Sequence, residues 1–194
     1  MTIRISAQPS TEPVSLSEAK AHLRVDIADD DTLISSLITA ARQILEVQAQ
    51  RQFVTATWVM TLDKFPLLCK EIRLLRPPIA SVTSIYYLNS AGTSTLLAAA
   101  DYRVDSASEP GRITPAYGKT WPIAYPVTNA VTVTYSAGYG AASAVPKAIT
   151  QAILLLVGHW YENREAVQAY GGGVTPLPMA VDALVAPFRV MEMA

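Results

Sequence analysis

The chain has 194 residues and a mass of 20.9 kDa, enough for one sizeable domain or for a small domain that carries an inserted module. Its net charge of −1 and isoelectric point near 6.1 lack the basic excess that tight nucleic-acid binding requires, so a DNA-binding factor is disfavoured. Hydrophobic residues make up 51% and charged residues only 16%, so we expect part of the apolar surface to meet other subunits.

Cysteine content and the lengths of the apolar runs indicate the compartment. Cys69 is the only cysteine, so no intrachain disulfide can form and a reducing compartment is favoured. No stretch approaches the roughly 18 consecutive apolar residues of a membrane span, and residues 1–13 have neither the basic nor the apolar region of a signal peptide. We therefore expect a soluble, unexported protein without membrane contact.

Two helices are predicted in the first fifty residues. Residues 15–25, SLSEAKAHLRV, open with the S-x-x-E pattern of a capping box, in which Ser15 and Glu18 satisfy free amides at the start of a short helix. After the acidic stretch DIADDD, apolar residues recur every three or four positions, which predicts a second helix over about 30–50.

Between residues 53 and 139 the pattern changes to short runs rich in Val, Ile, Thr and Tyr, separated by Pro, Gly, Asn and Ser. The clearest runs are TATWVMTL, EIRLL, SVTSIYYL, DYRV and AVTVTY, which predict a β module. NSAG, residues 89–92, predicts a hairpin turn, and RPPI predicts the start of an edge strand.

A long helix is predicted to begin after Pro146, which suits a first helical turn, and to continue over 147–167. It is apolar on nearly all sides as far as Val157, which predicts burial on several faces. YGGGVTPLP, residues 170–178, breaks the helical pattern, and one more short helix can follow before Pro187 stops it.

Together these elements predict an α+β fold with a mainly helical core and an inserted antiparallel β module. The core would consist of two N-terminal helices, one long helix and a short C-terminal helix. The predicted boundaries are 1–52 for the N-terminal helical part, 53–140 for the β insert, 141–170 for the long helix that completes the core, and 171–194 for a flexible linker and C-terminal tail.

The segment GHWYENREAV, residues 158–167, gathers polar and aromatic side chains at the end of the long helix. His159 and Glu162 could form an acid–base pair, which makes a small hydrolase one alternative function. The zinc motif H-E-x-x-H is absent and His22 is the only other histidine, so a structural or interface role is favoured. The predicted core or subunit interface residues are His159, Trp160, Tyr161, Glu162, Asn163 and Arg164.

Three other motifs fail when their neighbours are considered. GKT, residues 118–120, has Ile113 where a phosphate-binding loop needs glycine, and no helix follows it. GYGAAS, residues 138–143, is not part of a parallel βαβ unit. DIADDD has Asp31 where a calcium-binding EF-hand loop needs glycine. We therefore predict no catalytic residues, no metal site and no cofactor.

Eight segments follow one another along almost the whole chain: PVSLSEAKAHLRVD, DDDTLISSLITAAR, TWVMTLDKFP, IRLLRPPIASVTSIYYL, GRITPAYGKTWP, NAVTVTYSAGYG, VPKAITQAILLLVGHWYENREAV and LPMAVDALVAPFR. In this order and spacing they resemble the head–tail connector, or head-completion adaptor, family of long-tailed bacteriophages and prophages. GHWYENRE after an apolar helix is the most distinctive piece. RLLRPP departs from the family pattern, which more commonly has a proline nearer the strand end.

The resemblance implies a structural role without catalysis. Adaptors of this family assemble as a ring, usually twelve-fold, beneath the portal protein once DNA is packaged. The ring extends the DNA channel and offers a platform to a downstream stopper or tail-completion protein, while DNA passes through the lumen without specific binding. This implies a location at the virion head–tail junction, with assembly in the cytoplasm of the bacterial host. Connectors of gene transfer agents share the same parts and are an alternative origin.

Two hypotheses assign residues to this role. In the first, Trp160, Tyr161 and Arg164 anchor the long helix to the second helix or to a neighbouring subunit. In the second, the C-terminal tail is mobile in the free subunit and becomes ordered on the portal protein. The tail residues proposed to dock are Leu184, Phe188 and Arg189.

Overall fold

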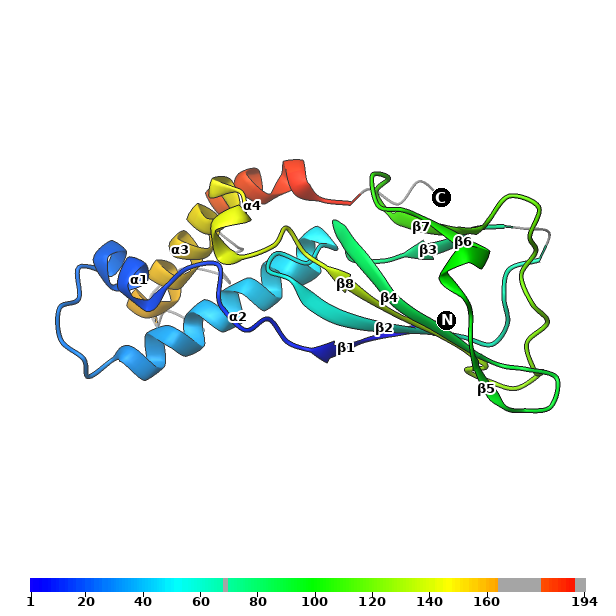
Figure 1. Cartoon of the computed structure of the whole chain (residues 1–194). Helices are drawn as coiled ribbons and strands as arrows, with labels where there is room; N and C mark the ends of the chain where they lie inside the picture. Colours follow the sequence, from blue (N-terminus) through cyan, green and yellow to red (C-terminus); the bar gives the residue numbers. More distant parts are fainter. Residues whose placement is uncertain (68–69, 164–178, 191–194) are drawn as a thin grey trace, which may run out of the picture. The chain divides into compact units, whose positions relative to one another are not determined.

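A computed structural model describes residues 1–67, 70–163 and 179–190 (Figure 1). The chain forms two compact units. A β unit comprises Met1–Ser10 and Thr55–Tyr139, and a helical unit comprises Thr11–Val54 and Gly140–Ala194. The α+β class is confirmed, but the description "mainly helical" is wrong, because the described part of the chain is 34% helix and 26% strand. None of its helices is long and apolar enough to cross a bilayer.

In its described residues the helical unit has four α-helices: α1 (Leu16–Leu23), α2 (Asp31–Ala49), α3 (Lys147–Glu162) and α4 (Met179–Val185) (Figure 1). Single 3-10 turns precede α3 and follow α4, at Ala142–Ala144 and Ala186–Phe188. The predicted capping box is present at α1. The Ser15 hydroxyl accepts the Glu18 N–H at 3.2 Å, and the Glu18 carboxylate accepts the Ser15 N–H at 2.8 Å.

The helix α3 packs against α1, α2 and α4 and forms the centre of this unit. Its residues Ile149, Ile153 and Leu156 are buried, and α2 contributes Ile34 and Leu45 to the same kind of apolar interior. Burial of α3 on several sides is therefore confirmed, and helices of the same unit provide the covering surfaces. The helix ends at Glu162, before the predicted limit of 167.

A buried polar network holds the last turns of α2 in a fixed relation to the chain around it. The Arg42 guanidinium donates to Glu12 at 2.7 Å and to Glu46 at 2.9 Å. Glu46 also accepts the Gln52 amide at 2.6 Å and the Phe53 N–H at 2.9 Å. Burial opposes the charge on Arg42, but the hydrogen bond to Glu12 and the negative charges of Glu46 and Glu12 raise the pKa of Arg42 above its ordinary value.

The β unit contains two antiparallel sheets. The five-stranded sheet has the order β1 (Thr2–Ala7), β2 (Ala56–Leu62), β8 (Val131–Ala137), β4 (Ile79–Leu88) and β5 (Ser94–Leu96). The three-stranded sheet has the order β3 (Ile72–Leu74), β7 (Gly111–Pro115) and β6 (Tyr102–Asp105). A further 3-10 turn, Ala99–Asp101, leads into β6.

Alternating burial along β8 shows how the sheet makes its core. Val131, Val133 and Tyr135 are fully buried, and the threonines between them are half-exposed. Each such side chain contributes roughly 1.5–3 kcal/mol when it is removed from water. The Tyr135 hydroxyl donates to the Leu75 carbonyl at 3.0 Å, so this buried polar group has a partner, and burial raises its pKa.

Three strands were not predicted: β1, β5 and β7. Of these, β1 lies within the range 1–52 that the sequence indicated as helical, and it pairs with β2 from Thr2 to Ala7. The hairpin at 89–92 is confirmed, because the Asn89 N–H donates to the Thr93 carbonyl at 2.9 Å and Gly92 has φ +74°. The strand that follows RPPI, β4, is paired on both sides near its end, with β8 and β5, so it is not a simple edge strand.

An acidic residue on the three-stranded sheet is strongly stabilised in its charged form. Asp105 accepts the Ser108 hydroxyl at 2.7 Å and the Arg112 guanidinium at 2.9 Å. These hydrogen bonds, that from Ser108 first, lower the pKa of Asp105 to about 2. Because the folded pKa lies below the unfolded value, this stabilisation is present above about pH 4 and is lost as the pH falls through about 2.

Replacing Arg42 by alanine should leave two carboxylates without their shared guanidinium. We expect a loss of about 3 kcal/mol in the free energy of unfolding, measured by urea denaturation with circular dichroism at 222 nm. The matched control is Gln43→Ala, an exposed neighbour on α2, which should change stability by no more than about 0.5 kcal/mol. A loss below about 1 kcal/mol for Arg42→Ala would show that the network is not coupled to folding.

Replacing Ser108 by alanine should raise the pKa of Asp105 from about 2 toward its ordinary value of 3.8, because the largest stabilising hydrogen bond is removed. A carboxyl-carbon NMR titration measures this directly. Ser106→Ala, an exposed serine in the same loop, is the control and should leave the midpoint unchanged. Equal midpoints for Ser108→Ala and wild type would contradict the assignment.

Candidate functional site

The end of α3 is tied to the start of α2 by a side chain of the predicted cluster. The Tyr161 hydroxyl donates to the Asp30 carboxylate at 2.5 Å, and Asp30 is the N-cap residue of α2. Hydrogen bonds between a hydroxyl and a carboxylate are short and strong because the acceptor is charged. Tyr161 therefore anchors the two helices within one chain, one of the two contacts that the sequence hypothesis allowed.

The neighbouring polar residues close the last turn of α3. The Asn163 backbone N–H donates to the His159 carbonyl at 3.0 Å, and its side-chain amide donates to the same oxygen at 2.9 Å. The Asn163 amide also lies 3.5 Å from His159 Nδ1. Glu162 is exposed, and among the described hydrogen bonds His159 meets Asn163 and not Glu162. The acid–base pair that a hydrolase would need is therefore not assembled.

The remaining members of the cluster are placed as follows. Trp160 is half-buried, and Arg164 lies outside the described residues. In the described part of the chain, no group of three or more His, Cys, Asp or Glu side chains is arranged to hold a metal ion. The described residues of the cluster end α3 and connect it to the start of α2. Their part in a subunit interface stays a prediction.

The C-terminal residues that the structure describes are packed on the helical unit. Val181 and Val185 of α4 are fully buried, and the Asp182 carboxylate accepts the Gln48 amide at 2.8 Å. The Val190 N–H donates to the Ala49 carbonyl at 3.0 Å. Residues 179–190 are thus packed on the helical unit in this structure, and mobility of the tail in the free subunit stays a prediction.

The three tail residues proposed to dock take part in this packing. Leu184 is half-buried, the Phe188 carbonyl accepts a hydrogen bond from Arg51, and Arg189 forms an ion pair with Asp182. The predicted linker, residues 170–178, lies outside the described residues. Docking of these three residues on another protein stays a prediction.

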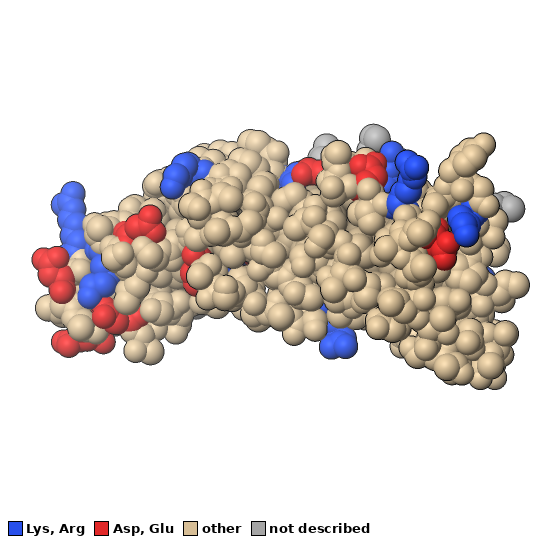
Figure 2. Space-filling view, in the orientation of Figure 1, with Lys and Arg blue, Asp and Glu red and all other residues tan. Residues whose placement is uncertain are grey.

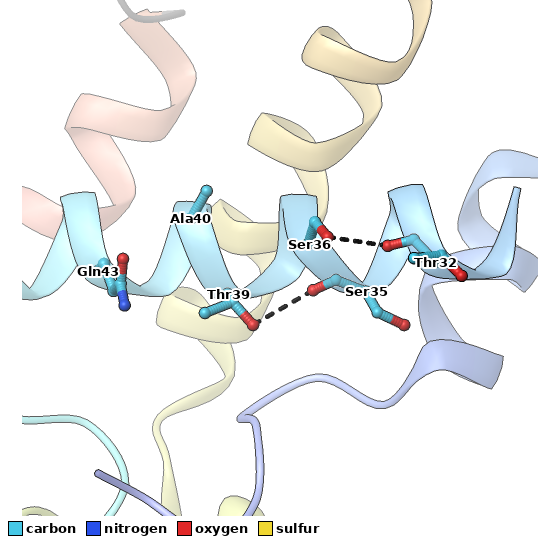
Figure 3. Close-up of a pocket in the computed structure, with 6 residues that line it drawn as sticks. All are labelled: Thr32, Ser35, Ser36, Thr39, Ala40 and Gln43. Atoms are coloured by element: carbon cyan, nitrogen blue, oxygen red, sulfur yellow. Dashed lines mark hydrogen bonds between the residues drawn. The ribbon is translucent and has the colours of Figure 1, made fainter.

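An uncharged surface on α2 was not predicted. Figure 3 shows a shallow depression along this helix, lined by Thr32, Ser35, Ser36, Thr39, Ala40 and Gln43. Exposed Ile44 and Val47 continue the surface toward the end of the helix. We call these eight residues the α2 face. The absence of charged residues at these positions can be seen in the sequence. The apolar periodicity of a helix indicates only its buried side, so it did not identify this exposed surface.

The hydroxyl groups of Ser35, Ser36 and Thr39 on the α2 face donate to carbonyls of their own helix, and that of Thr39 also donates to Glu12 at 3.0 Å. The Ser36 hydroxyl donates to the Thr32 carbonyl at 2.9 Å, and the Thr39 hydroxyl donates to the Ser35 carbonyl at 3.2 Å (Figure 3). A donor that already has a partner loses little when water is removed. This surface can therefore be covered by another protein at low cost.

The two units differ in charge although the whole chain is nearly neutral. The β unit has eight Lys or Arg and five Asp or Glu, a net charge of +3, and the helical unit carries −4. Acidic side chains gather around α1 and the loop between α1 and α2 in Figure 2. Asp26 and Asp29 in that loop are exposed.

Replacing Tyr161 by phenylalanine removes only the hydroxyl that donates to Asp30. We expect a loss of about 1.5 kcal/mol in the free energy of unfolding, because the lost hydrogen bond has a charged acceptor. Tyr117→Phe removes the same atom from a side chain that is 97% exposed, and this control should stay within about 0.5 kcal/mol of wild type. Equal effects of the two substitutions would contradict an anchoring role.

Comparison with known proteins places the chain in a family. No curated protein sequence matches it. Among solved structures, it is similar to a chain in the virion of the native gene transfer agent particle, with a TM-score of 0.80, 24% identity, and coverage of 100% of this chain and 98% of that one. Similar chains occur in the neck of the empty particle computed with C6 symmetry and in the neck of the native particle computed with C12 symmetry, with TM-scores of 0.78 and 0.77. Both are also 24% identical, with the same coverage of 100% and 98%.

These structures share the fold of the chain, and the family is given by its sequence. The model of the head completion protein family matches residues 13–176. This range contains α1, α2, the strands from β2 to β8, and α3. The resemblance found in the sequence is thereby confirmed, and the chain belongs to the head completion protein family.

Proposed function

We propose that the chain is a structural head–tail connector subunit, which assembles with further copies into a ring beneath the portal protein. The ring would extend the DNA channel and offer a docking platform to a downstream stopper or tail-completion protein. Membership of the head completion family supports this role, and the role requires no catalytic step. In this role the protein would lie at the head–tail junction of a virion, and it would be assembled in the host cytoplasm.

The observation that carries the proposal is the α2 face. A ring is closed by one contact repeated around an axis, so each subunit needs a surface that the next copy can cover. Interface centres are depleted of charged residues, and the α2 face has none, although its helix belongs to a unit with a net charge of −4. Its internally bonded hydroxyls further lower the cost of burial.

The order of the ring is supported by the solved structures of similar fold. One is a neck computed with C12 symmetry and another a neck computed with C6 symmetry. We therefore propose a twelve-fold ring. The same matches favour the alternative origin, in which the chain is the connector of a gene transfer agent rather than of a phage.

The acidic charge of the helical unit supports an inert DNA channel. Phosphates bind where Lys and Arg neutralise them, and the exposed loop between α1 and α2 carries Asp26 and Asp29 instead. If this loop lines the lumen, DNA would pass without adhering. For the portal contact, the proposed docking residues are Leu184, Phe188 and Arg189. They lie near the end of the described residues, and each is half-buried.

The test is a substitution of Ser36 by arginine on the α2 face. Light scattering of the wild-type chain mixed with its portal protein should give the mass of a ring on the portal, because copies can then assemble on a template. Ser36→Arg should abolish the ring, since the charge would be buried without a partner.

Gln151→Arg is the matched control, because it places the same side chain at an exposed position of α3 and should assemble as wild type does. If Ser36→Arg and Gln151→Arg both assemble, the α2 face is not the ring contact. If the wild-type chain neither assembles nor binds the portal, the connector role is wrong.

A further inference from the structure

The β unit contains an apolar groove that the proposed ring does not use. Phe65 forms its floor, stacked on Trp121 with ring centroids 5.0 Å apart and an angle of 9° between the planes. Tyr87 meets Phe65 edge-on at 5.7 Å. Pro66 and Pro122 line the groove beside these rings. Aromatic and proline side chains in such an arrangement favour extended, proline-containing chains.

Two large apolar side chains project beside this floor. Ile123 is 87% exposed and Leu67 is 69% exposed, and both line the groove. Large exposed apolar side chains that adjoin other apolar groups usually mark a surface that another molecule covers. The groove and its two projecting side chains therefore form one continuous apolar surface.

The loop that carries Trp121 and Ile123, residues 116–130, is fixed in place although it contains no helix or strand. The Trp121 indole N–H donates to the Lys70 carbonyl at 2.8 Å, and the Tyr125 N–H donates to the Leu88 carbonyl at 2.8 Å. The Asn129 N–H donates to the Asp63 carboxylate at 2.9 Å. Long loops of this kind in compact domains are usually functional, and a loop that is already ordered loses little entropy on binding.

We propose that this groove binds an extended, apolar, proline-containing segment flanked by Asp or Glu, which belongs to a different protein of the neck. The positive charge at the groove selects the flanking residues. Lys64 lines the groove and is exposed, and the β unit as a whole carries +3. An acidic flank would pair with this charge and orient the apolar centre on Trp121 and Ile123.

A second copy of the chain fits this groove less well. Where the β units of two copies meet in a ring, they bring the same positive charge together. Each of the five acidic residues of that unit already has a hydrogen-bond or ion-pair partner: Asp63, Glu71, Asp101, Asp105 and Glu109. The carboxylates of a neighbouring β unit are therefore already engaged. This inference rests on the proposed function only in assuming that other neck proteins meet the subunit.

The test uses the full chain and two labelled peptides, followed by fluorescence anisotropy. Both peptides have a Pro-Leu-Pro-Ile centre, flanked by acidic pairs in one and by lysine pairs in the other. We expect the acidic peptide to bind at least tenfold more tightly. Ile123→Asp and Lys64→Glu should each weaken its binding at least tenfold, and neither side chain is needed for folding because both are exposed.

The matched control is Leu96→Asp, which introduces the same charge at a leucine of β5 that is 54% exposed and does not line the groove. It should change binding less than twofold. Equal affinity for the two peptides, or equal effects of Ile123→Asp and Leu96→Asp, would overturn the proposal.

Ring assembly separates this proposal from the proposed function. Ile123→Asp should still form the ring on the portal protein, and loss of the ring would assign the groove to a neighbouring copy and overturn the inference. If the wild-type chain binds the acidic peptide as expected but forms no ring, the groove is supported and the connector role is wrong.

Discussion

The helical unit depends on one charge held between two others. Arg42 lies between Glu12, which precedes α1, and Glu46 one turn further along α2. Burying three charged groups adds little net stability, because each loses its hydration. What the arrangement fixes is position. Glu46 also holds Gln52 and the Phe53 amide, so the segment before α1, the last turns of α2 and the chain that leaves for the β unit are set relative to one another.

Because these contacts fix the position of α2, its exposed side is available for contact with other subunits. Its buried side supplies Ile34, Ile38 and Leu45 to the interior, and its outer side has uncharged residues, three of whose hydroxyls donate to carbonyls of the same helix. The β unit instead concentrates positive charge and a preordered apolar loop. These differences support the two proposals made above, in which the helical unit contacts other copies of the chain and the β unit contacts a different protein.

Patterns local in sequence were predicted well, and contacts between distant segments were not. The capping box at Ser15 and the apolar spacing of α2 depend on residues three or four apart, so both were found. The strand β1 was missed because the six residues TIRISA gain their partner only from β2, more than fifty residues later. The network of Arg42, Glu46 and Glu12 was not predicted, because Glu12 lies thirty residues before Arg42 in the chain. The contact of Tyr161 with Asp30 could not be predicted, because it depends on where the α1–α2 loop lies.

The chain enters and leaves the main part of the β unit through neighbouring strands. Ala56, the first residue of β2, is the cross-strand partner of Ala137, the last residue of β8. The two points of entry and exit are therefore side by side, as the ends of an insertion must be if the host fold is to close around it. Residues between them can lengthen, shorten or change sequence while the spacing that the helical unit must bridge stays the same. The surface of the insert can therefore change while the helical unit keeps its own packing.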